Sequence, residues 1–246
     1  MPPRFYSAPL PDPALPDPCC KLDPDETRHA RRVLRLGPGD AVVLFDGAGG
    51  VADAVITGYE AAAAVCRVSA RRQEFLPGPR LTVGAAVPKG SRGEAMVDQL
   101  GQLGVAAFVP LRCARGVVEP SQGKVQRYAK TALASAKQSG RAWVMAVEPM
   151  VGLAELLGRR WDRGLILDPA GTADAAAELA QARSTWFTED AEIAVLVGPE
   201  GGWSDEELAA AAAVGFVRWR IAAHVLRIET AATAAAAILG HSSLSG

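Results

Sequence analysis

Residues 193–207 read IAVLVGPEGGWSDEE, which is an apolar run followed by a glycine-rich turn and an acidic helix start. The run predicts a buried strand at 192–197, and Ser204 and Glu207 have the spacing of a helix capping box. Three glycines beside a proline allow a tight loop whose backbone can approach a ligand closely. The loop is neither a dinucleotide-binding fingerprint nor a P-loop. Taken alone, it is equally compatible with an ordinary strand-to-helix turn.

The same alternation of strands and helices extends on both sides of this stretch. Strands are expected at 81–87, 106–111, 143–147, 164–167, 192–197 and 216–221. Helices are expected at 92–103, 124–137, 153–157, 173–182, 205–214 and 229–239, with a second capping box beginning at Ser91. Such alternation predicts an α/β domain with a mostly parallel sheet.

The first 75 residues follow a different pattern. Asp23 is the expected N-cap of a helix with Pro24 in its first turn and Glu26 closing a capping box, and the helix ends at the turn 37–40. Short strands expected at 41–45, 51–57 and 62–70 predict a small β-barrel. The sequence FLPGP at 75–79 is the expected linker, so the chain divides into domains 1–75 and 76–246.

Composition places the chain among ordinary globular proteins, with 49% hydrophobic residues, 22% charged residues and a formal net charge of −1. No apolar run is long enough to span a bilayer and no signal core follows the first residues, so we expect a cytoplasmic protein without a membrane partner. The four cysteines form no C-x-x-C pair and accompany no histidine cluster, so no metal is expected. The near-neutral charge argues against non-specific coating of nucleic acid.

A second polar loop, residues 221–230, joins the last expected strand to an alanine-rich helix. In parallel α/β sheets, ligands bind beyond the carboxyl ends of the strands. This loop and the glycine-rich turn at 198–202, called the glycine loop below, are therefore the expected ligand sites. Arg227 and Glu229 are its chemically notable side chains. A salt bridge, or a carboxylate favoured by the helix dipole, would explain Glu229 equally well.

Several ordered motifs together resemble the RsmE family, the 16S rRNA (uracil-1498-N3)-methyltransferases. The motifs are RFY at 4–6, HARRVLRLGPGD at 29–40, FDG at 45–47, KGSRGEAM at 89–96, LGV at 103–105, ASAKQSGR at 134–141, LVGPEGGWSDEE at 196–207 and VLRIETA at 225–231. The likeness covers nearly the whole chain. It implies a small PUA-like β-barrel domain that binds RNA, followed by a SPOUT-type parallel sheet with a C-terminal trefoil knot.

The resemblance also implies a function, a cofactor and partners. The function is S-adenosylmethionine-dependent methylation of N3 of a uridine in 16S rRNA, the partner is 16S rRNA or the assembled small ribosomal subunit, and two subunits pair as a homodimer. The residues that match the family's cofactor loops are Leu167, Asp168, Val197, Gly198, Glu200, Gly201, Gly202, Ile221, Val225, Leu226 and Arg227.

Candidate catalytic residues follow from the chemistry of uracil N3, which carries a proton that must leave. An arginine beside uracil O2 or O4 would stabilise the resulting anion, and Arg227 and Arg141 are the candidates. Glu229 would accept the proton or orient Arg227. The basic residues expected to contact RNA are Arg28, Arg31, Arg32, Arg35, Lys89 and Arg92. For those on the N-terminal helix, a solvated helix face is an equal interpretation.

The sequence departs from the family pattern in the second loop. Residues 221–224 read IAAH where the family usually has Leu-Gly-Pro-Arg, and Ile228 stands where threonine is typical. Lys137 replaces a usual glutamate. These departures leave two alternatives open. One is a SPOUT methyltransferase acting on another RNA site, such as a tRNA nucleoside, and the other is a non-catalytic RNA-binding ribosome assembly factor.

Overall fold

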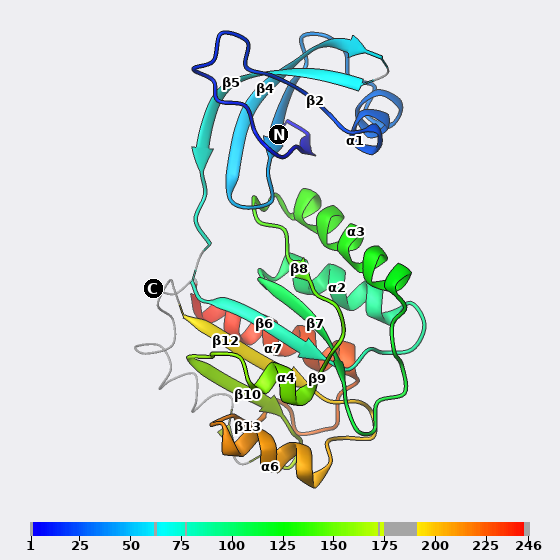
Figure 1. Ribbon diagram of the computed structural model, residues 1–246, viewed down its shortest axis with the longest axis vertical. Helices are drawn as coiled ribbons and strands as arrows, with labels where there is room; N and C mark the ends of the chain where they lie inside the picture. Colours follow the sequence, from blue (N-terminus) through cyan, green and yellow to red (C-terminus); the bar gives the residue numbers. More distant parts are fainter. Residues whose placement is uncertain (1, 62, 77, 172, 175–190, 244–246) are drawn as a thin grey trace. The chain divides into compact units, whose positions relative to one another are not determined.

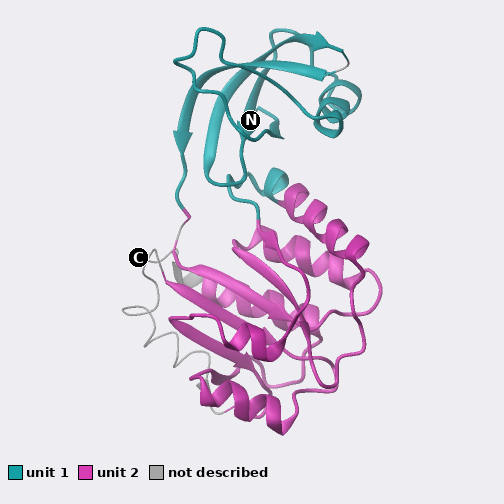
Figure 2. Cartoon of the chain, in the orientation of Figure 1, with its two compact units in different colours: residues 1–75, 136–144 teal, residues 76–135, 145–246 magenta. Residues whose placement is uncertain are grey.

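The computed structural model describes residues 2–61, 63–76, 78–171, 173–174 and 191–243. The chain forms two compact units, coloured separately in Figure 2. Unit 1 comprises residues 1–75 and 136–144, and unit 2 comprises residues 76–135 and 145–246. Sequence reasoning assigned 136–144 to the second domain, whereas their contacts assign them to the first.

Unit 1 is built on a five-stranded sheet in the order β1-β3-β4-β5-β2. Its elements are β1 (Arg4–Tyr6), β2 (Cys19–Lys21), α1 (Pro24–Arg28), the wider π turn η1 (His29–Val33), β3 (Ala41–Phe45), β4 (Gly50–Glu60) and β5 (Ala63–Gln73). β1 runs parallel to β3, and the other neighbours are antiparallel. Among the described residues these pairings form a series that ends at β1 and β2. Sequence reasoning missed both end strands, because three residues carry no periodic signal.

The helix that opens at Asp23 differs from its prediction in two ways. Asp23 caps it as expected, because its Oδ1 accepts a hydrogen bond from the Glu26 amide at 2.7 Å. The Glu26 carboxylate, however, accepts from Lys137 Nζ at 2.6 and 2.8 Å instead of closing a capping box. The expected single helix also changes to a π turn after Arg28.

Residues 142–144 lie along the turn between β3 and β4. The Gly49 amide donates to the carbonyl of Ala142 at 3.1 Å, and the Val144 amide donates to the carbonyl of Gly47 at 3.0 Å. The Trp143 indole donates to the carbonyl of Glu74 at 3.1 Å. Residues 143–144 therefore do not belong to the strand that was predicted at 143–147. Of that predicted strand, only β8 (Ala146–Val147) pairs in the sheet of unit 2.

Unit 2 is an α/β domain with a parallel sheet, as predicted. The strand order is β11-β13-β10-β12-β6-β7-β8, with β9 paired to β7, and every described pair is parallel. Its strands are β6 (Arg80–Ala85), β7 (Ala107–Arg112), β8, β9 (Val151–Gly152), β10 (Arg163–Leu167), β11 (Ala173–Asp174), β12 (Glu192–Val197) and β13 (Val217–Arg220). Its described helices are α2 (Arg92–Gln102), α3 (Gln122–Ser139), α4 (Leu153–Leu157), α6 (Asp205–Ala213) and α7 (Ile228–Ser243), α3 continuing into unit 1.

The sheet of unit 2 is covered on both faces, which is how parallel sheets bury their strands. Figure 1 shows α7 and α4 on opposite faces of the sheet. α7 packs on β6 and β12, and α2 packs on α7. Small side chains allow this approach, since α7 buries four alanines in two adjacent pairs, 231–232 and 235–236.

Of three predicted local features of unit 2, one was confirmed, one was wrong, and one is contradicted at its first two residues. The capping box at Ser204 is complete, but Ser91 makes no side-chain cap bond and has helical dihedral angles. In the helix predicted at 173–182, residues 173–174 form β11, and the remainder lies outside the described residues. Among the residues that the structure describes, no helix is long and apolar enough to cross a membrane.

Replacing Lys137 by alanine should destabilise the protein by about 3 kcal/mol, because it leaves the Glu26 carboxylate buried without a counter-ion. The side chain of Glu26 is 5% exposed and that of Lys137 is 20% exposed. Urea-induced unfolding measures the effect. The control is Lys21→Ala, which removes an exposed pair with Glu60 and should cost less than about 1 kcal/mol. Equal effects of the two substitutions would contradict this assignment.

Candidate functional site

Three neighbouring strands of unit 2 end at the same level of the sheet. Leu167, the last residue of β10, pairs with Val197, the last residue of β12, and also with Trp219 near the end of β13. The loops that leave these strands therefore start side by side. Carboxyl ends of parallel strands that meet in this way are the usual location of a ligand site in α/β domains.

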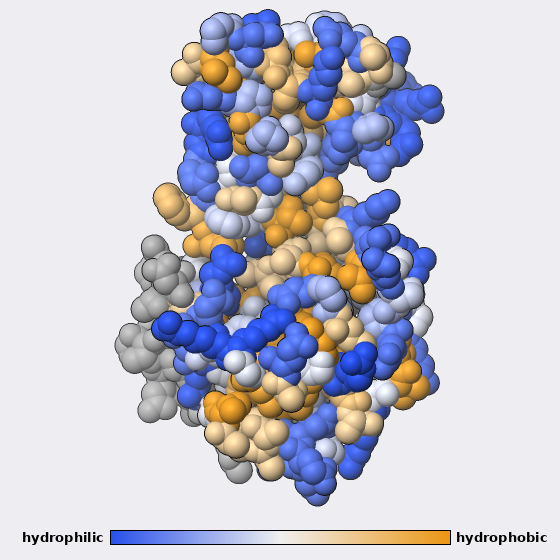
Figure 3. All heavy atoms as spheres, in the orientation of Figure 1, coloured by the Kyte–Doolittle hydropathy of each residue, from blue (hydrophilic) through white to orange (hydrophobic). Residues whose placement is uncertain are grey.

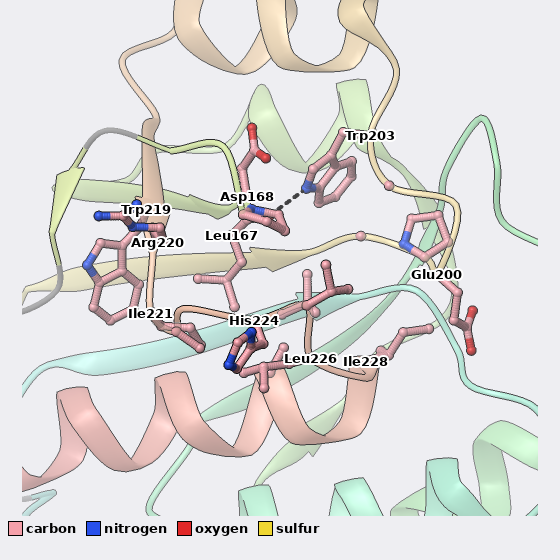
Figure 4. Close-up of a pocket in the computed structure, with 18 residues that line it drawn as sticks. Leu167, Asp168, Glu200, Trp203, Trp219, Arg220, Ile221, His224, Leu226 and Ile228 are labelled. Atoms are coloured by element: carbon pink, nitrogen blue, oxygen red, sulfur yellow. Dashed lines mark hydrogen bonds between the residues drawn. The ribbon is translucent and has the colours of Figure 1, made fainter.

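A cavity lies between these loops and the start of α7, with about 700 Å³ of space free of protein atoms, part of it open to solvent. Figure 4 shows the side chains around it. Its lining residues are Leu167, Asp168, Pro169, Val197, Gly198, Pro199, Glu200, Gly202, Trp203, Trp219, Arg220, Ile221, Ala222, His224, Val225, Leu226, Ile228 and Ala231.

The lining contains every residue predicted for the cofactor loops except Gly201 and Arg227. Sequence reasoning had not named Trp203, Trp219 and Ala231 as lining residues. Trp203 follows the glycine loop directly, so its position in sequence was a usable signal. Trp219 and Ala231 lie inside a strand and a helix, and only the strand register and the helix phase bring them to the cavity.

The glycine loop folds tightly around Trp203. The Trp203 indole donates to the carbonyl of Leu167 at 2.9 Å, drawn as the dashed line in Figure 4. A Cβ atom on Gly198 would lie 2.9–3.1 Å from the Trp203 ring, so glycine at this position leaves room for the indole. Gly202 has a φ of +72°, a conformation that favours glycine. The glycines thus serve the packing and path of the loop.

The two acidic residues that line the cavity each have a cationic partner. Asp168 Oδ2 accepts from Arg218 Nε at 2.7 Å, and its Oδ1 accepts from the Ala170 amide at 2.9 Å. Glu200 Oε1 lies 3.8 Å from Arg92 Nη2, and Figure 4 shows its carboxylate directed away from the other labelled side chains. The acids therefore support the loops from outside the apolar centre of the cavity.

The predicted catalytic residues lie in different places. Arg227 is exposed at the start of α7, where its carbonyl accepts from the Ala231 amide at 2.8 Å. Glu229 Oε1 lies 3.4 Å from Arg92 Nη1, and its Oε2 is buried without a hydrogen-bond partner among the described residues. Arg141 belongs to unit 1, and burial lowers the pKa of its guanidinium group. The cavity is lined by unit 2 alone.

The predicted RNA-binding residues divide between the units. Arg28, Arg31, Arg32 and Arg35 are exposed in unit 1, where Arg28 pairs with Asp25. Figure 3 shows hydrophilic residues gathered over the end of unit 1 that carries α1. In unit 2, Lys89 is exposed, whereas the guanidinium group of Arg92 lies between Glu200 and Glu229.

Replacing Gly198 by alanine should destabilise the glycine loop by about 1–3 kcal/mol, because the added methyl group overlaps the Trp203 ring. We expect a lower melting temperature and faster hydrogen exchange of the loop amides. Gly58→Ala is the control, since that site has no left-handed φ and nothing within 4 Å of the added atom. Unchanged loop exchange in Gly198→Ala would show that the ring can move aside without cost.

Comparison with known protein families matches both units. A family model described as an RNA methyltransferase domain matches residues 76–240, and one described as an RNA methyltransferase PUA domain matches residues 22–61. The chain is 32% identical to ribosomal RNA small subunit methyltransferase E of Synechocystis, over 86% of this chain and 69% of that protein. It is 30% identical to the protein of the same name from Mycobacterium bovis, over 96% and 90% of the two chains.

Solved structures extend this likeness to the fold. Ribosomal RNA small subunit methyltransferase E of Neisseria gonorrhoeae, bound to S-adenosylmethionine, has a TM-score of 0.83 at 28% identity over 98% of both chains. A putative methyltransferase of Legionella pneumophila in complex with the same cofactor has a TM-score of 0.84 at 26% identity, also over 98% of both chains. From the family models and the curated relatives together, the chain belongs to the ribosomal RNA small subunit methyltransferase E family.

Proposed function

We propose that this chain transfers a methyl group from S-adenosylmethionine to N3 of a uridine in the rRNA of the small ribosomal subunit. The observation that carries the proposal is the composition of the cavity. Its lining combines the glycine loop with Ile221, Ala222 and His224, from the loop that departs most from the family sequence. Family membership and the two cofactor-bound neighbours support the same assignment.

The lining residues fit a nucleoside cofactor. Apolar side chains such as Leu226, Ile228 and Ala231 suit a flat adenine ring, while the backbone of the glycine loop offers amides and carbonyls to polar edges. S-adenosylmethionine, when bound, supplies an electrophilic methyl group on a sulfonium. The protein's contribution is to hold the cofactor and the base in line, which converts a bimolecular encounter into a positioned reaction.

The proposal includes the wider organisation that the family resemblance implies. The catalytic domain has a SPOUT fold with a C-terminal trefoil knot, the enzyme works as a homodimer in the cytoplasm, and 16S rRNA within the small subunit is the partner. The strand order supports the fold assignment, because β10 lies between β12 and β13 and the three pocket loops emerge together.

Arg227 is the proposed electrostatic catalyst. Its exposed side chain sits between two residues that line the cavity, Leu226 and Ile228, so the guanidinium group is available to a base beside the cofactor. There it would stabilise negative charge on uracil O2 or O4 as the N3 proton leaves. Arg141, in unit 1, is a second proposed contributor. Glu229 is the proposed proton acceptor, a role that requires its carboxylate to separate from Arg92.

The direct test incubates the purified protein and labelled S-adenosylmethionine with small subunits from cells that lack the modification, followed by mass spectrometry of the nucleosides. We expect 3-methyluridine in 16S rRNA, and parallel reactions with naked 16S rRNA define the preferred substrate. Methylation of tRNA alone would favour a different RNA target. Absence of cofactor binding would favour the non-catalytic assembly factor.

Changing Arg227 to alanine should lower kcat about 10²- to 10³-fold, the usual cost of removing one donor that stabilises developing charge. Binding of S-adenosylmethionine should change little, since Arg227 does not line the cavity. Single-turnover methylation and calorimetry measure the two quantities separately. The control Arg220→Ala removes an exposed arginine that does line the cavity, and it should affect cofactor binding more than kcat. Full turnover by Arg227→Ala would remove it from the mechanism.

The exposed arginines at 28, 31, 32 and 35 of unit 1 are the proposed RNA contacts, together with Lys89. The double variant Arg31→Gln/Arg32→Gln should weaken RNA binding and reduce the salt dependence of log K by about 0.7 to 0.9 per lost phosphate contact. Filter binding across a range of salt concentrations measures both. A matched control, Arg67→Gln/Arg72→Gln, removes two arginines of β5 that pair with Asp17 and Asp53. Identical salt slopes in the two double variants would refute a specific patch.

A further inference from the structure

One arginine outside the cavity contacts the glycine loop from behind. Arg115 lies in the turn after β7, and its Nη1 donates to the carbonyl of Gly201 at 3.0 Å and to the carbonyl of Trp203 at 3.1 Å. These two carbonyls flank Gly202, which has a φ of +72° and whose amide closes the turn by donating to the carbonyl of Pro199 at 2.9 Å. One cationic group therefore bridges the bend, and hydrogen bonds from a charged donor are stronger than neutral ones.

The stem of Arg115 also packs on the loop. A Cβ atom at Gly201 would lie 3.2 Å from Arg115 Cβ and 3.5 Å from its Cδ, so the arginine stem occupies the space that a side chain at 201 would need. This gives Gly201, which does not line the cavity, a physical reason to be glycine. The loop faces the cavity with Pro199, Glu200 and Gly202, and faces Arg115 with the opposite side.

The neighbouring residue secures the end of the same loop. The Ala114 amide donates to Glu207 Oε1 at 2.8 Å, while Glu207 Oε2 accepts from the Ser204 amide at 2.8 Å. Ala114 and Arg115 together thus fix both the bend of the loop and its entry into α6. They lie 86 residues or more before their partners in the chain.

We infer that Arg115 is a positioning residue for the cofactor, one that holds residues 198–203 in the shape that binds S-adenosylmethionine. The inference rests on the proposed function. A loop that is ordered before binding avoids the entropy cost of ordering during binding, so losing this bridge weakens affinity. Since Arg115 touches neither the cavity nor the reacting atoms, it leaves the chemical step at saturating cofactor largely unchanged.

The test is calorimetric binding of S-adenosylmethionine to wild type, Arg115→Gln, Arg115→Lys and Arg112→Gln. Arg115→Gln should raise Kd about tenfold, which corresponds to part of the free energy of one hydrogen bond from a charged donor. Arg115→Lys keeps a long cationic donor and should fall between wild type and glutamine. Arg112→Gln is the matched control, because Arg112 is the last residue of β7, just before the turn that carries Arg115, but its side chain pairs with the exposed Glu119. Its Kd should equal that of wild type.

Two further readouts separate positioning from general damage. In Arg115→Gln, amides of 200–204 should exchange hydrogen faster while β10 and β12 stay protected, and kcat at saturating cofactor should remain within about twofold of wild type.

The outcomes are distinct from those that test the proposed function. If wild type does not bind S-adenosylmethionine, the function itself fails. If wild type binds and Arg115→Gln binds with the same Kd and the same loop exchange, the function stands and the positioning role of Arg115 is overturned. An equal loss of affinity in Arg112→Gln would also overturn it, since the effect would then not depend on the contacts to Gly201 and Trp203.

Discussion

The pocket depends on three neighbouring parallel strands that end at the same level. β10 is the central one, and its last residue, Leu167, pairs with both Val197 and Trp219. A slip of one residue in either pairing would move every side chain of a strand to the opposite face of the sheet and shift its loop by about 3.3 Å. Both faces of β10 and β12 are buried, so close packing of side chains of different size against the covering layers opposes such a slip and holds the loops in register.

The carbonyl of Leu167 links the register of the strands to the position of the glycine loop. It lies at the end of β10, and it accepts the Trp203 indole, which folds the glycine loop back over the strand ends. Gly198 provides the space for that ring. A buried carbonyl without a donor costs roughly 1–3 kcal/mol, so the indole is favoured at this position for a backbone reason as well as for its apolar surface.

Local signals in the sequence predicted the elements well where the structure depends on neighbours in the chain. The bounds of β3, β12 and α4 were predicted to the residue, and the capping box at Ser204 is present. The failures involve distant partners. Glu26 has the spacing of a capping residue, but its carboxylate meets Lys137, 111 residues away. No periodicity encodes that meeting, and the same is true of residues 136–144 joining unit 1.

The candidate site shows the same division at a finer scale. Residues inside the pocket loops were found from motifs, whereas the contacts to those loops from the other half of unit 2 were not, because no local pattern encodes them. Arg92, at the start of α2, lies near Glu200 and Glu229, and Arg115, after β7, bridges the glycine loop. The second half of the unit therefore supplies the cavity together with Arg218, which pairs with Asp168, and the first half supplies two further cations, Arg92 and Arg115, that contact the pocket loops. A folded pocket consequently requires both halves.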